Sequence, residues 1–261
     1  MKELFEAIGK YFIKAMLYLQ ETTLLTFEIT IAAFTPPFRF RYFIEQVEYI
    51  GIQSMMIAIL TAIFTGAVMA LQMAFSLKRF GADAFVANIL SVSLVRELGP
   101  VLTGLMVGGR VGAGITAEIG SMQVTEQIDA IKALGADPVR ELFVPKTLAC
   151  MVVLPILIVY ADIIGNLAGM LVSVIELGVE PVYYMDQVFR ILKISDFLGG
   201  VAKGIFFGLI IGVVGCYLGL KTKGGTVGVG MATTTSVVAI FLSILLADLF
   251  LTKLLMLLFQ V

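Results

Sequence analysis

The chain has 261 residues, of which 59% are hydrophobic and only 14% are charged, and its mean hydropathy is +1.02. A soluble domain of this length has too little interior to hide so much apolar surface, so the composition indicates a protein whose solvent is a lipid bilayer. The net charge of −1 argues against a nucleic-acid partner, and the lack of histidine excludes histidine triads, histidine-metal sites and imidazole proton relays.

The first 48 residues are predicted to form two helices that lie along the membrane surface without crossing it. Residues 1–19 carry apolar side chains at helical spacing with charged side chains mostly opposite, the pattern of an interfacial amphipathic helix. Residues 22–35 are apolar, but the segment is short and Glu21 and Glu28 make spanning costly. A Pro-Pro pair ends it, and residues 38–48, where charges alternate with aromatics, are predicted as the second surface helix.

Residues 49–261 are predicted to form an all-α transmembrane domain of five spanning helices, each longer than the roughly 20 residues that a span requires. The five segments run over about residues 52–77, 85–115, 148–175, 197–220 and 232–259. Cys150 and Cys216 lie within apolar segments and are expected as buried, inert thiols. Most of the 18 Lys and Arg residues fall on one side if the N-terminus is cytoplasmic, which predicts that the C-terminus is outside.

A mixed polar and apolar passage at 118–146 separates the second and third spans. Its apolar residues recur every three or four positions, at Val124, Ile128 and Ile131. Polar side chains such as Glu126 and Asp129 take the other side, which predicts a short amphipathic helix over about 118–136 on one side of the bilayer. From periodicity alone, a loop helix resting on the lipid headgroups explains the pattern equally well.

Five motifs in series resemble those of the MlaE family of ABC-transporter permeases. They are R-E-L-G-P at 96–100, A-E-I-G-S-M at 117–122, T-E-Q-I-D-A at 125–130, A-L-G-A-D-P at 133–138 and G-V-G-M-A-T-T at 228–234. The resemblance extends from about Gly51 to the C-terminus, and the series of motifs is far more specific than any one of them.

The resemblance implies a permease subunit that moves phospholipid between membranes. It implies a homodimer in a bacterial inner membrane, with cytoplasmic ATPase subunits that bind the ATP and a periplasmic MCE-domain partner. Because no transit peptide is recognisable, a bacterial membrane is favoured over a plastid. The family's coupling helix, which docks into the ATPase, maps onto residues 118–136. The expected coupling residues are Glu118, Met122, Glu126 and Asp129. The chain itself is expected to bind no cofactor and no metal.

Arg96 and Glu97 place two charges inside the second span. Charges deep in a bilayer are costly, so they are expected to face a polar cavity, a partner or a headgroup rather than acyl chains. One interpretation is an ion pair with another span. The other, favoured by the resemblance, is a gate or headgroup contact in a lipid cavity whose wall includes Leu98.

The outer end of the first span presents an adaptable apolar face that the same cavity could use. Its residues are Met69, Met73, Ser76, Leu77 and Phe80. Methionine and phenylalanine accommodate acyl chains of varied shape, although ordinary helix packing or lipid exposure explains the spacing at least as well.

Two sets of glycines at helical spacing predict close helix–helix packing. They are Gly104, Gly108 and Gly112 in the second span and Gly208, Gly212, Gly215 and Gly219 in the fourth. Such small-residue ridges let helices approach closely. The glycine-rich runs at 109–114 and 224–230 lack the Lys-Ser/Thr of a phosphate loop, so no ATP site is expected on this chain.

Two other classes of function are alternatives to a permease. An intramembrane lipid-modifying enzyme would use Arg96, Glu97 and Asp162, but no nucleophile–base pair or metal cluster stands at a suitable spacing. A passive channel or scaffold fits poorly with an uncharged first span and an apolar cavity face. Asp162 and Asp248 are equally compatible with interhelical hydrogen bonding. The expectation is a permease that is not itself an enzyme.

Overall fold

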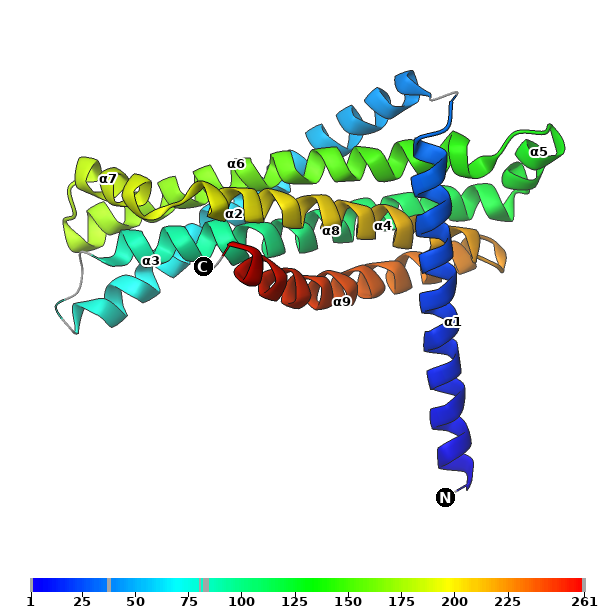
Figure 1. Ribbon diagram of the computed structural model, residues 1–261, viewed down its shortest axis with the longest axis horizontal. Coiled ribbons are helices and arrows are strands. Elements are labelled where there is room, and N and C mark those ends of the chain that lie inside the picture. Colours follow the sequence, from blue (N-terminus) through cyan, green and yellow to red (C-terminus); the bar gives the residue numbers. More distant parts are fainter. Residues whose placement is uncertain (1, 37–38, 80, 82–84, 260–261) are drawn as a thin grey trace.

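The computed structural model describes residues 2–36, 39–79, 81 and 85–259. These residues form an all-helical bundle, as predicted, and no strand occurs among them (Figure 1). The α-helices are α1 (Lys2–Ala33), α2 (Phe40–Lys78), α3 (Val86–Ser93), α4 (Gly99–Val124), α5 (Gln127–Ala133), α6 (Val144–Leu177), α7 (Pro181–Ile191), α8 (Ile194–Leu220) and α9 (Gly225–Phe259). Two π-helical segments each continue directly into the α-helix that follows. η2 (Leu94–Leu98) continues into α4, and η3 (Val139–Phe143) continues into α6.

Five helical segments of the described chain are long and apolar enough to cross a bilayer, which confirms the predicted number of spans. They are Phe40–Lys78, Val86–Val124, Val139–Leu177, Ile194–Leu220 and Gly225–Leu258. The spans run along one another, with α5 at one end of the bundle and α7 at the other (Figure 1). These two short helices mark the two membrane faces of the molecule, called here the α5 end and the α7 end.

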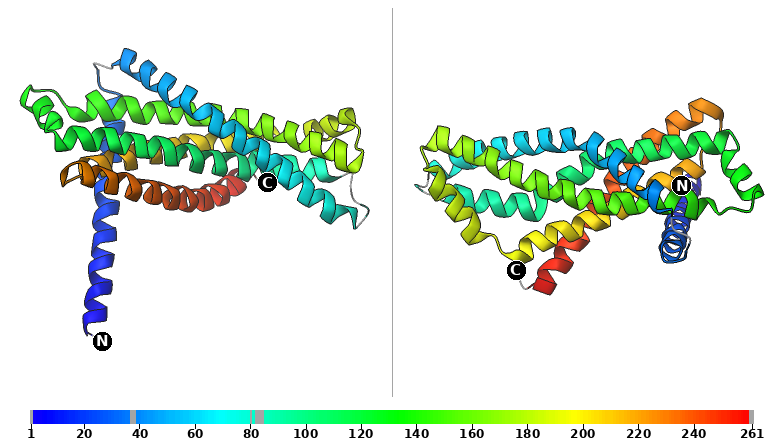
Figure 2. Two further views of the ribbon diagram at one scale, coloured as in Figure 1. Left: turned by 180° about the vertical axis from the view of Figure 1, so that it is seen from behind. Right: turned by 90° about the horizontal axis from the view of Figure 1, so that it is seen from above.

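The N-terminal region differs from the two surface helices expected for it. α1 is one helix from Lys2 to Ala33, because the stretch between its amphipathic and apolar parts contains no glycine or proline. The expected second surface helix at 38–48 is the start of α2, so the boundary at residue 48 falls inside a continuous helix. α1 runs across the bundle rather than along it (Figure 2).

α1 is fixed to the bundle by polar and aromatic contacts at the α5 end of α8. Tyr217 donates a hydrogen bond to Glu21 at 2.5 Å, and the Lys221 ammonium lies 2.9 Å from the same carboxylate. The rings of Tyr18 and Tyr217 meet edge to face with centroids 5.3 Å apart. These hydrogen bonds lower the pKa of the Glu21 carboxyl, since they favour its charged form.

The predicted glycine ridges are confirmed as sites of close helix packing. A Cβ on Gly104 would lie 2.9 Å from the Phe207 ring, and one on Gly112 would overlap the Ile240 side chain. On α8, a Cβ on Gly208 would lie 2.5 Å from the Cys150 carbonyl oxygen. A side chain at Gly208 would meet the backbone of α6, whereas at Gly104 and Gly112 a neighbouring side chain would have to shift, so the glycines allow the close approach of the spans.

The closest helix packing in the structure is between α2 and α6, and it was not predicted from the sequence. α2 buries one stripe of mostly small residues, Ile50, Ser54, Ala58, Ala62, Gly66, Ala70 and Ala74. At Gly66 the backbone of α2 meets the backbone of α6 at Gly165, since a Cβ on Gly66 would overlap the Gly165 carbonyl. The repeat of small residues every four positions was visible in the sequence and predicts this contact.

The passage between the second and third spans is organised differently from the single helix expected over 118–136. α4 continues to Val124, and Thr125 and Glu126 then form a turn in which Glu126 adopts a left-handed φ of 59°. α5 occupies only Gln127–Ala133. Val124 and Ile128 therefore belong to different helices, and Ile128 is fully buried rather than part of a continuous stripe.

Candidate functional site

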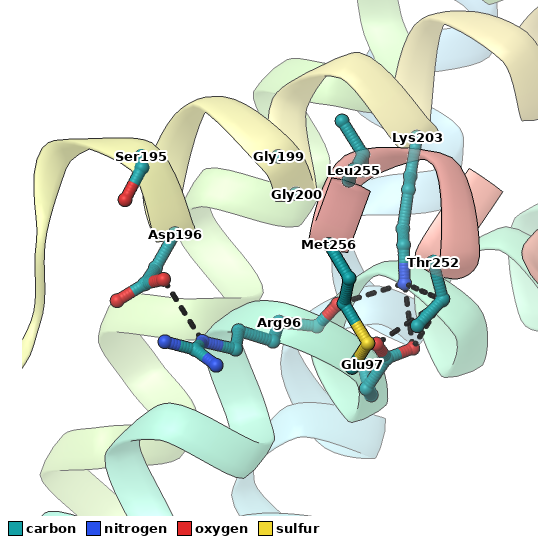
Figure 3. A pocket seen from close by; sticks show the side chains of 10 residues that line it. All are labelled: Arg96, Glu97, Ser195, Asp196, Gly199, Gly200, Lys203, Thr252, Leu255 and Met256. Atoms are coloured by element: carbon teal, nitrogen blue, oxygen red, sulfur yellow. Dashed lines mark hydrogen bonds and ion pairs between the residues drawn. The ribbon is translucent and has the colours of Figure 1, made fainter. Parts of the chain in front are cut away.

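A network of five charged side chains joins the second, fourth and fifth spans at the π-helical segment η2. The Arg96 Nε atom lies 2.9 Å from Asp196 Oδ1 of α8. The Lys203 ammonium of α8 lies 2.5 Å from Glu97 Oε2 and 2.9 Å from Asp248 Oδ1 of α9. These five residues are called the interspan charge network (Figure 3 shows four of them). The ion-pair interpretation of Arg96 and Glu97 is therefore satisfied within the chain.

Lys203 is the centre of the network. Its side chain is only 2% exposed, and besides the two carboxylates it donates to Thr252 Oγ1 at 2.7 Å and to the Arg96 carbonyl at 3.0 Å. An ammonium buried in a membrane span is tolerated only with such complete pairing. The network consequently ties three spans together at one point.

The sequence of η2 explains why the Arg96 carbonyl is free to accept this bond. Pro100 has no backbone N–H, so it cannot donate to the carbonyl four residues earlier, which belongs to Arg96. The preceding residue, Gly99, donates its backbone N–H to the Leu94 carbonyl, five residues earlier, which is the hydrogen-bond pattern of a π-helix. The proline thus releases one carbonyl inside the bilayer, and Lys203 occupies it.

A small pocket lies beside the network, between η2, the start of α8 and the end of α9 (Figure 3). Its volume is about 40 Å³. Its lining residues are Arg96, Glu97, Ser195, Asp196, Gly199, Gly200, Lys203, Thr252, Leu255 and Met256. A volume of this size holds a few water molecules or one small polar group, and one chain alone does not enclose a whole phospholipid headgroup there.

The other residues expected to line a lipid cavity are not among those that line this pocket. Met69, Met73 and Leu98 pack against a small buried cluster formed by Ala70, Ala87, Leu90, Leu94, Tyr184 and Val188. Ser76 is exposed and Leu77 is half-buried on α2. Phe80 lies outside the described residues. The structure brings Arg96 and Glu97 together in the pocket and does not bring the α2 residues to it.

Sequence reasoning missed Asp196, Lys203 and Thr252 as members of the site and considered Asp248 only as an interhelical hydrogen-bonding group. Lys203 and Asp248 each stand inside an otherwise apolar run, and the charge of Lys203 is opposite to those of Asp248 and Glu97. Because an unpaired charge in a span is costly, this complementarity was the signal that predicts their contact.

The four expected coupling residues fall into two groups. Glu126 and Asp129 are exposed at the α5 end, and Asp129 makes only an exposed contact with Lys132 at 3.4 Å. Met122 is partly buried against the main core. Glu118 belongs to α4 and pairs with Lys146 of α6 at 2.7 Å. Glu118 is exposed as well, with 48% of its side chain accessible, so three of the four residues are presented outward, and of these Glu118 is paired with a buried lysine of another span.

The partner of Glu118 is a second buried lysine, near the α5 end. The Lys146 side chain is fully buried, and its ammonium also lies 3.3 Å from Gln46 Oε1 and 5.5 Å from the centroid of the Tyr42 ring. The residue joins α6 to the last turns of α4 and to the first turns of α2.

Five spans held together by glycine packing and buried ion pairs define a multi-pass, all-α membrane protein with a short helix exposed at one membrane face. The family model described as Permease MlaE matches residues 43–254. The chain belongs to the MlaE permease family, and it is an ABC-transporter permease subunit, a class that works with ATPase partners.

The relatives agree with this assignment over most of the chain. A protein of Rickettsia felis named "Probable ABC transporter permease protein" is 39% identical over 95% of this chain and 96% of its own length. A protein of Synechocystis with the same description is 40% identical over 80% of each chain. The chloroplastic protein TRIGALACTOSYLDIACYLGLYCEROL 1 of Arabidopsis thaliana is 35% identical over 78% of this chain and 59% of its own length.

Proposed function

We propose that this permease moves phospholipid between membranes. The observation that carries the proposal is the interspan charge network with its pocket, set inside segments long enough to cross a bilayer. A polar site beside apolar helix faces suits a molecule with a charged head and apolar tails. The name of the Arabidopsis relative contains the name of a galactolipid, which supports a lipid as the cargo.

The proposed assembly is a homodimer in a bacterial inner membrane, with the N-terminus and the α5 end in the cytoplasm. α2 buries one stripe of residues against the bundle and α9 leaves most of its surface outward, so both have faces for lipid or a second copy. ATP binds to the ATPase partner and not to this chain. A periplasmic MCE-domain protein receives or delivers the lipid at the α7 end.

Photocrosslinking at two adjacent residues of α9 tests the lipid proposal. Met256 lines the pocket, whereas Leu257 does not, although both are exposed, at 51% and 71%. A photoreactive residue at position 256 is expected to capture phospholipid that survives delipidating purification. The same residue at 257 loses its lipid, because bulk bilayer lipid is washed away. Equal capture at 256 and 257 after washing contradicts the proposal.

The α5 end is proposed as the surface that docks to the ATPase. Glu126 and Asp129 are exposed there, next to the turn between α4 and α5. The charge reversals Glu126→Lys and Asp129→Lys are expected to reduce ATPase retention on the purified permease while insertion stays normal. Asp186→Lys, an exposed carboxylate on α7, is the matched control. Normal retention and transport in both α5-end variants contradict this assignment.

A further inference from the structure

The interspan charge network contains more negative than positive charge. Its carboxylates are Glu97, Asp196 and Asp248, and its cations are Arg96 and Lys203. Asp196 neutralises Arg96, and its second oxygen is taken by the backbone N–H of Lys193 at 3.0 Å. Glu97 and Asp248 share the single ammonium of Lys203. One negative charge is therefore in surplus inside a membrane-spanning region, where a charge without a partner is costly.

Of the two carboxylates that share Lys203, Glu97 is the one that faces the pocket, and its oxygens already accept hydrogen bonds from Lys203 and from the Thr252 hydroxyl. Asp248 is not among the residues that line the pocket, although it forms an ion pair with Lys203, which is. Glu97 does line the pocket, and 38% of its side chain is exposed. Arg96 points to the opposite side of the pocket from Glu97 and is already paired with Asp196 (Figure 3). An anionic headgroup thus meets no unneutralised cation, whereas a cationic group meets a carboxylate.

The hydrogen-bond acceptors of the pocket select among cationic groups. About 40 Å³ accommodates a primary ammonium, which is close to a water molecule in size. A trimethylammonium group has no N–H, so it cannot donate a hydrogen bond to Glu97 or to the Thr252 hydroxyl. The apolar side chains of Leu255 and Met256 form part of the lining and suit the carbon chain next to the charged group.

We propose that this pocket binds the primary ammonium of an ethanolamine headgroup, so that the permease selects phosphatidylethanolamine over anionic and choline lipids. The inference rests on the proposed phospholipid cargo and specifies its headgroup. Asp248 acts as a positioning residue, because its ion pair with Lys203 leaves a net negative charge beside Glu97, whose oxygens accept from Lys203 and Thr252 and keep lone pairs for a further donor.

The test measures which lipid the permease retains. The full chain with its ATPase partner is reconstituted in vesicles of equal phosphatidylethanolamine, phosphatidylcholine and phosphatidylglycerol, purified with delipidating washes, and its retained lipid is determined by mass spectrometry. About tenfold enrichment of phosphatidylethanolamine is expected, the size of one charge-assisted hydrogen bond. Asp248→Asn removes the surplus charge and is expected to abolish the enrichment, while Asp186→Asn on α7 keeps it.

Glu97→Gln is the second variant, since it leaves the Lys203–Asp248 pair in place if Asp248→Asn fails to fold. It is also expected to lose the enrichment. Retained phospholipid in equal headgroup proportions in the unaltered protein overturns the ethanolamine inference and leaves the phospholipid proposal standing. Retention of no phospholipid at all overturns both. Enrichment that persists in Asp248→Asn and Glu97→Gln shows that the preference arises elsewhere and overturns this site.

Discussion

The same four residues, V-R-E-L, occur at 95–98 and at 139–142, and both copies lie in π-helical segments that a proline follows. Their surroundings differ. In η2, Arg96 pairs with Asp196, whose side chain is 2% exposed. In η3, Arg140 pairs at 3.5 Å with Asp137, which is 50% exposed. The shared sequence accompanies the same backbone geometry in both segments, whereas burial decides how much each charged side chain contributes to stability.

The largest expected difference between the two segments is at the arginines. Arg96→Met leaves the buried Asp196 carboxylate without its cation, and such a loss costs about 3–5 kcal/mol. Arg140→Met removes a surface ion pair, which is worth about 0–1 kcal/mol. Unfolding of the two purified variants in the same detergent measures the difference. Equal destabilisation would show that burial does not set the value of the motif.

A smaller difference in stability between a buried and an open position is expected at two glycines of α4. A side chain on Gly112 would overlap Ile240, whereas a Cβ on Gly114 meets no atom within 4 Å. Gly112→Leu is expected to destabilise the protein by about 1–3 kcal/mol through overpacking, and Gly114→Leu to melt as the unaltered protein does. Thermal unfolding in detergent provides the readout. A wild-type melting temperature for Gly112→Leu would mean that α4 and α9 do not meet there.

The smallest expected effect concerns pH at the exposed contact that holds α1. The pKa of Glu21 is lowered by hydrogen bonds from Tyr217 and Lys221, so its contribution to docking is present at neutral pH. The contribution is lost as pH falls through this lowered pKa, below the ordinary value of 4.5. The sequence has no tryptophan, so Tyr18→Trp gives a single fluorescent reporter next to Tyr217. The fluorescence of this tryptophan is expected to change as pH falls through the pKa of Glu21. The change is expected to disappear when Glu21→Gln is added to the Tyr18→Trp variant.

Several features of the fold follow from local sequence. The five spans are apolar runs of sufficient length, and the ridge at Gly104, Gly108 and Gly112 follows from helical spacing. The continuity of α1 could also have been predicted, because no helix-breaking residue separates its two parts. The recurrence of V-R-E-L before a proline was a further local signal that went unused.

The partners of the charged residues could not be predicted from local sequence. Arg96 meets Asp196 one hundred positions later in the chain, and which span lies beside η2 depends on the packing of the whole bundle. The same holds for Lys146, whose burial follows from the meeting of three helices. The α2 face at Met69 was predicted from spacing alone, and spacing does not say which neighbour a face meets.

The backbone contact between Gly66 and Gly165 has a mechanical consequence. With no side chain between them at that point, α2 and α6 cannot slide past each other without breaking the fit of their main chains. Because α2 also buries a stripe from Ile50 to Ala74, the two helices are expected to move as one unit. A displacement of α6 near Lys146 is then expected to carry the whole of α2 with it.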